Sequence, residues 1–103
     1  MSPNPQPELT PDGHHIVVKG RRWRATDPSI PAEPARQLRG HLMAARRAIA
    51  AARRAEDPQA EGAARARVQT AKVALGERGT PWWEQSPAER RARWQSGLTA
   101  LDP

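Results

Sequence analysis

The 103-residue chain has no cysteine, phenylalanine or tyrosine. Without cysteine it can form no disulfide, no thiolate zinc site and no cysteine nucleophile. It also has no run of about 18 apolar residues and no basic-then-apolar leader, so we expect neither membrane insertion nor secretion. We therefore expect a cytoplasmic protein.

Large apolar residues are scarce, with four tryptophans and two methionines beside a scatter of leucine, isoleucine and valine. Alanine makes up much of the 37% hydrophobic fraction. A chain of this length forms one domain with a modest core. A core built largely from alanine requires helices that approach each other closely.

Positive charge is concentrated in the middle of the chain. The formal net charge is +6, and between residues 36 and 78 ten basic residues face four acidic ones. Only Lys19 and Lys72 among the 17 basic residues are lysines, a usage typical of GC-rich bacterial genomes. Such asymmetry bears on association with anionic partners more than on fold.

The pattern predicts a flexible, proline-rich tail over residues 1–12 and a single small domain over residues 13–103. Residues 14–26 have the composition of a β-hairpin with the two-residue loop Lys19-Gly20. This loop pairs Val18 with Arg21 and Ile16 with Trp23. Because an isolated two-stranded ribbon is marginal in water, we expect its apolar face to lie against helices.

Three helices are predicted, over residues of about 32–55, 58–78 and 87–101. In the first, apolar residues recur at steps of four and three from Leu38 to Ala52. Asp57-Pro58 supplies an N-cap and first position for the second helix, and Ser86-Pro87-Ala88-Glu89 a capping box for the third. We expect a mostly α fold: an antiparallel helical hairpin plus a short C-terminal helix, with the N-terminal β-hairpin packed on it.

Five segments form a recognisable pattern within roughly residues 8–84. They are the run from Asp12-Gly13 through Ile16-Val17-Val18, GRRWRATDP from Gly20, LMAARRA from Leu42, AKVALGERG from Ala71 and PWWE from Pro81. This pattern resembles a small bacterial protein family often labelled "biopolymer transporter Tol". The resemblance supports the architecture above and implies no activity, cofactor or site residue.

No residue set predicts catalysis or metal binding. His14 and His15 are adjacent strand residues that point to opposite faces, and neither they nor His41 have a cysteine or well-spaced acidic partner. Neither a nucleophile setting, nor a paired-carboxylate motif, nor a glycine-rich phosphate loop is present. We expect a protein that is not an enzyme and uses no cofactor.

The arginines of the first helix are the main candidate site. Between Glu33 and Glu56 no acidic residue offers an i, i+4 partner, so these guanidiniums repel one another and favour an anionic partner. Binding to a nucleic-acid backbone, independent of base sequence, is the leading hypothesis. The predicted contacts are Arg36, Arg39, Arg46, Arg47, Arg53 and Arg54, with Arg22 and Arg24 on the hairpin. On a helical wheel Arg39, Arg46 and Arg53 flank the apolar stripe, and Arg36, Arg47 and Arg54 point away from it.

The rival hypothesis is a protein-interaction module or a homodimer. We expect Trp23 and Trp94 in the core, whereas Trp82 and Trp83 lie in a linker where at least one can anchor a partner. The predicted partner-binding patch comprises Trp82, Trp83, Met43 and Val73. Binding to anionic lipid head groups is a third hypothesis, against which the mostly alanine face of the first helix counts.

Overall fold

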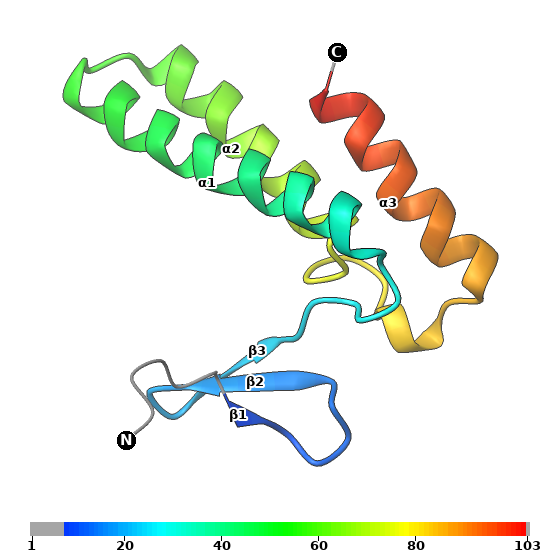
Figure 1. The fold of residues 1–103 in the computed structure, drawn as a ribbon. Coiled ribbons are helices and arrows are strands. Elements are labelled where there is room, and N and C mark those ends of the chain that lie inside the picture. The colour runs from blue at the N-terminus through cyan, green and yellow to red at the C-terminus, as the bar shows by residue number, and fades with distance from the viewer. Residues whose placement is uncertain (1–7, 103) are drawn as a thin grey trace.

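The computed structural model describes residues 8–102, in which three short strands are followed by three α-helices (Figure 1). The strands are β1 (Glu8–Leu9), β2 (His15–Val18) and β3 (Arg21–Arg24). The helices are α1 (Ala32–Arg54), α2 (Pro58–Ala74) and α3 (Pro87–Leu101), with a 3-10 turn η1 (Trp82–Glu84) before α3. The predicted mostly α fold is confirmed.

The β-hairpin has the predicted register. Ile16 pairs with Trp23 and Val18 with Arg21. Lys19 and Gly20 have φ angles of 51° and 77°, the left-handed pair that a tight two-residue hairpin loop requires. Opposed residues of antiparallel strands share a face, so Ile16, Val18 and Trp23 form the apolar side of the sheet.

The sheet has a third strand that the sequence did not predict. Glu8 pairs with Val17 and Leu9 with Ile16, in the order β1-β2-β3. The turn that returns the chain is held by Asp12, whose carboxylate accepts from the Thr10 hydroxyl (2.6 Å) and the His14 amide (3.0 Å). The predicted flexible tail over residues 1–12 is therefore wrong for residues 8–12, and residues 1–7 lie outside the described part.

The helical hairpin forms as its spacing predicts. Asp57 caps α2 by accepting from the Ala60 amide at 3.0 Å. The buried stripe of α1 faces small residues of α2, which bring the two helices together. The core is the buried cluster Ile30, Ala35, Leu38, Leu42, Ala71, Ala74, Leu75 and Leu101, with Val68, Trp94 and Leu98 packed against it.

Helix α2 ends at Ala74, four residues before the predicted end near residue 78. Gly76, at φ 83°, takes the left-handed position, its amide bonding to the Val73 carbonyl (3.0 Å) and the Glu77 amide to that of Lys72 (2.9 Å). This pair of bonds is the usual glycine-dependent helix stop. A helix end near residue 78 would correspond to Gly79, the second glycine of this stretch, whereas the helix stops at the first, Gly76.

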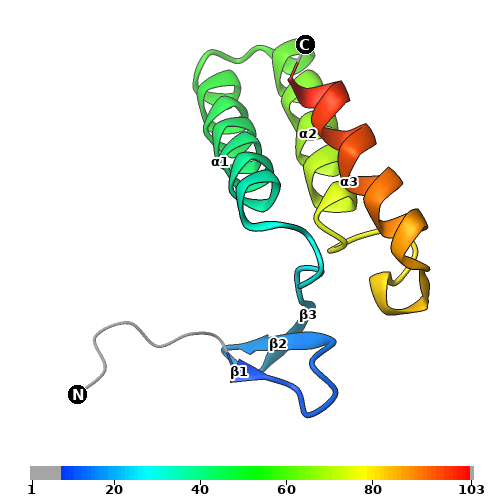
Figure 2. The same cartoon turned by 45° about the vertical axis from the view of Figure 1, so that its right-hand side comes forward.

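Helix α3 returns along α2 after the predicted capping box of Ser86 and Glu89. Gly97 is buried against α2, and a Cβ built on it would lie 2.3 Å from the Ala74 Cβ. Two views show the three helices side by side, with the sheet beyond the end where α1 begins and α2 finishes (Figures 1 and 2). The sheet thus packs on the helices at one end only.

Candidate nucleic-acid interface

The α1 arginines divide into paired and unpaired groups. Arg36 forms an ion pair with Glu33, and Arg53 Nε lies 3.2 Å from a Glu61 carboxylate oxygen. The hydrogen bond from Arg36 lowers the pKa of Glu33, and those from Arg65 and Arg53 lower the pKa of Glu61, so both carboxylates stay charged. Arg36 is exposed as expected, but the expectation that it has no acidic partner is wrong, because Glu33 lies one turn before it.

Four α1 arginines remain without an acidic partner anywhere in residues 8–102: Arg39, Arg46, Arg47 and Arg54. All four are exposed. Arg39 and Arg46 lie seven residues apart, which separates them by about 11 Å along the helix axis. Like charges at this density on one helix repel each other, and an anion lying along the helix would relieve the repulsion.

Arg39 and Arg46 border a groove of about 720 Å³ between the helices and the sheet. The opposite wall is the apolar side of the sheet, formed by Ile16, Val18 and Trp23. The remaining lining residues are Arg24, Thr26, Lys72 and Glu77. The groove thus has one basic wall and one apolar wall.

The closed end of the groove is fixed by bonds within the protein. Glu77 accepts a hydrogen bond from the Thr26 hydroxyl (2.7 Å) and lies 3.8 Å from Lys72 Nζ. Arg24 donates to the Gly79 carbonyl at 2.7 Å and lies over the Trp83 ring at 5.7 Å. Arg39 and Arg46 are therefore the lining cations that have neither an ion pair nor a side-chain hydrogen bond within residues 8–102.

The two hairpin arginines of the predicted site are not equivalent. Arg24 takes part in the docking of the sheet, whereas Arg22 is exposed. Only Arg24 lines the groove. The structure therefore does not bring Arg22 together with the α1 arginines.

Trp23 does not lie in the core, contrary to expectation. It is 45% exposed, and its ring carries the Arg21 guanidinium at 4.7 Å. The apolar face of the sheet borders the groove instead. Trp94 packs against the core as predicted.

The predicted partner-binding patch is not assembled. Trp82 is 7% exposed and donates from Nε1 to the Ala25 carbonyl (3.0 Å), which excludes it as a surface anchor. Trp83 is half-buried and stacks on His14, with ring centroids 3.9 Å apart. Met43 is 55% exposed on α1, and Val73 is half-buried beside Gly79.

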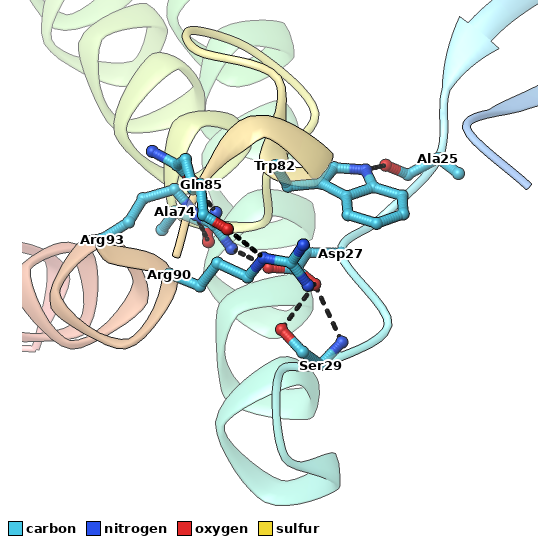
Figure 3. A network of polar contacts seen from close by, with 8 residues as sticks. All are labelled: Ala25, Asp27, Ser29, Ala74, Trp82, Gln85, Arg90 and Arg93. Carbon is cyan, nitrogen blue, oxygen red and sulfur yellow. Dashed lines mark hydrogen bonds and ion pairs between the residues drawn. The ribbon is translucent and has the colours of Figure 1, made fainter. Parts of the chain in front are cut away.

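A buried ionic junction joins the sheet, the end of α2 and the start of α3 (Figure 3). Asp27 is 1% exposed, and its carboxylate accepts from Arg93 and from the amide and hydroxyl of Ser29. Arg90 lies 3.7 Å from the same carboxylate. The Asp27 amide donates to the Leu75 carbonyl at 2.9 Å. With its polar groups satisfied inside the protein, this junction holds the groove walls in place.

The sequence did not single out the junction or the role of Trp23 in the groove. Asp27-Pro28 is a recognisable turn signal, but nothing local connects it with Arg93, 66 residues further on. The clue to the groove was the apolar face of the hairpin itself. On α1 the positions beside the stripe are arginines, and Trp23 on the other side of the groove stays 45% exposed.

Within residues 8–102 the histidines do not form a cluster that could hold a metal ion. His14 and His15 both touch the Trp83 ring, and His41 lies 3.8 Å from a carboxylate oxygen of Asp102.

Across residues 8–102 none of the helices has the length and hydropathy to cross a bilayer. No protein-family model matches the chain, and comparisons with curated proteins and with solved structures find no match either.

Proposed function

We propose that this is a small non-enzymatic protein of the cytoplasm that binds nucleic acid through its phosphate backbone. The observation that carries the proposal is the set of exposed α1 arginines without an acidic partner in the described residues: Arg39, Arg46, Arg47 and Arg54. Arginine presents a planar fork of donors that matches phosphate oxygens. Contacts of this kind contribute to the affinity for nucleic acid but do not read its base sequence.

The distribution of the remaining charge supports this choice. Arg36 is already paired with Glu33, and Arg53 shares Glu61 with Arg65, so within residues 8–102 the protein's own acids leave most of the α1 arginine charge without compensation. A rigid helix holds the unpaired cations at fixed spacing, which lowers the entropic cost of binding a regular polyanion.

A protein-interaction role or a homodimer is the second candidate. Leu9, Val18 and Met43 are large apolar side chains that are 58%, 39% and 55% exposed. Leu9 and Val18 lie on the same face of the sheet as Trp23, and contiguous exposed apolar surface marks interaction sites in soluble proteins. Light scattering at two protein concentrations distinguishes a stable monomer from a self-associating chain.

The nucleic-acid proposal is tested with a matched pair of charge reversals, Arg47→Glu and Arg91→Glu. Both arginines are exposed helical residues, without an ion pair in the part of the chain described, and both substitutions change net charge equally. We expect Arg47→Glu to weaken binding of a labelled oligonucleotide about tenfold and Arg91→Glu to weaken it much less. A gel shift at about 50 mM salt measures both.

The salt dependence gives an independent check. If the four α1 arginines each contact a phosphate, a plot of the logarithm of the binding constant against the logarithm of the salt concentration should have a slope of about −3 to −4. Equal effects of the two reversals would show that only net charge matters. Absence of any shift with DNA and RNA at low salt would refute the proposal.

A further inference from the structure

We propose that the groove between the sheet and the α1–α2 hairpin binds single-stranded nucleic acid, with bases against Trp23 and phosphates against Arg39 and Arg46. This inference rests on the proposed function and names the form of nucleic acid that the groove accepts. It follows from the unlike chemistry of the two walls and from their charge.

The apolar wall offers an aromatic surface at the groove. Trp23 is 45% exposed even though Arg21 lies over its ring at 4.7 Å. Ile16 pairs with Trp23 across the sheet, and Val18 extends the wall toward the hairpin loop. Successive bases of a single strand stack on such aromatic side chains, and every base has a suitable face.

The basic wall complements a phosphate backbone. Four basic side chains line the groove, Arg24, Arg39, Arg46 and Lys72, against the single acid Glu77. Lys72 is beside Glu77 and Arg24 is bonded to the Gly79 carbonyl, which leaves Arg39 and Arg46 for a ligand. Both line the groove from α1, so an anion between the walls can contact both.

The pairing of a basic wall with an aromatic wall favours a single strand over other occupants. A duplex keeps its base faces inside the stack, where Trp23 cannot reach them. An acidic peptide would satisfy Arg39 and Arg46 but has no systematic need of an exposed indole. A second copy of the chain would bring more positive charge, because the net charge is +6.

The test compares Trp23→Leu with Trp23→Phe, which keeps an aromatic ring at the same strand position. Binding is measured by anisotropy of a labelled 12-nucleotide thymidine oligonucleotide and of an abasic oligonucleotide of equal length and charge. We expect Trp23→Leu to weaken binding of the first about fivefold to a hundredfold and to leave the abasic strand unaffected. Trp23→Phe should retain most of the affinity.

Folding of both variants is verified by circular dichroism and by the emission of the remaining tryptophans. Trp82 bonds to Ala25, next to β3, and reports whether the sheet is still docked. Arg46→Glu is the complementary variant and should weaken binding of both oligonucleotides, because both carry phosphates.

The outcomes separate this inference from the proposed function. If Trp23→Leu binds thymidine and abasic strands as the wild type does while Arg46→Glu loses both, stacking in the groove is wrong and phosphate binding stands. If a duplex of equal length competes as well as the single strand, the groove assignment is likewise wrong. If the wild type binds no oligonucleotide but an acidic peptide or a second copy, both proposals fail together.

Discussion

At the scale of single residues, Asp27 has the largest predicted effect on stability. Its carboxylate is buried and serves Arg93 and Ser29 together. Removing one partner of a buried ion pair leaves the other charge without compensation and costs about 3–5 kcal/mol. Since Arg90 is partly exposed, water relieves part of that cost.

We therefore expect Asp27→Ala to lower the free energy of unfolding by about 3 kcal/mol, the lower end of that range. Urea unfolding at pH 7 measures the change. Asp12→Ala is the control, because Asp12 is an exposed turn residue, and it should cost much less. Equal losses of unfolding free energy in the two variants would mean that the buried junction contributes no more to stability than an exposed turn.

The contribution of Asp27 to the free energy of unfolding should also depend on pH. Burial by itself raises the pKa of Asp27, but the hydrogen bonds from Arg93 and Ser29 outweigh it and hold the pKa below its usual value. The contribution of Asp27 is therefore present above about pH 4, the unfolded value, and is lost as the pH falls through the lower folded pKa. Between about pH 4 and pH 2 the wild type should lose stability more steeply than Asp27→Asn.

At the scale of elements, local signals predicted what depends on nearby residues. Lys19-Gly20 specified the register of β2 and β3, and Asp57-Pro58 specified the start of α2. The errors arose where distant residues decide. Trp23 was assigned to the core because an apolar face needs cover, and the sequence does not show that α1 faces it with arginines.

Replacing a helical glycine with alanine should raise or lower the free energy of unfolding, depending on how closely that glycine is packed. Gly62 lies in α2, and a Cβ added there would have nothing within 4 Å, so Gly62→Ala should raise the free energy of unfolding by about 1 kcal/mol. Gly97→Ala would place its Cβ 2.3 Å from that of Ala74 and should lower it by about 1–3 kcal/mol, despite the better helix propensity.

Thermal or urea unfolding of the two alanine variants tests how closely α2 and α3 approach. A stabilising Gly97→Ala would show that α3 packs more loosely on α2 than the structure has it. Gly40→Ala in α1, another open helical position, serves as a second stabilising control.

At the scale of the whole molecule, the sheet and the helices form the two sides of the groove and are joined at one end of it. The hydrogen bonds and ion pairs between them, within residues 8–102, come from residues 24–27 on one side and 75–93 on the other. The candidate site could be predicted only in part from sequence. The arginines of α1 can be recognised from the sequence of one helix. The groove cannot, because it depends on contacts between residues that are far apart in the chain.

The free end of the β-hairpin has a topological consequence. Lys19 and Gly20 are exposed at its tip, away from the joined end, so a strand can be laid between the walls from the side without threading. A covalently closed circle of thymidines should then bind as tightly as a linear strand of the same length, which competition anisotropy can measure. Binding restricted to linear strands would mean that the walls close around their ligand. A side-loading groove instead lets the protein settle on internal stretches of a long polymer, where no end is available.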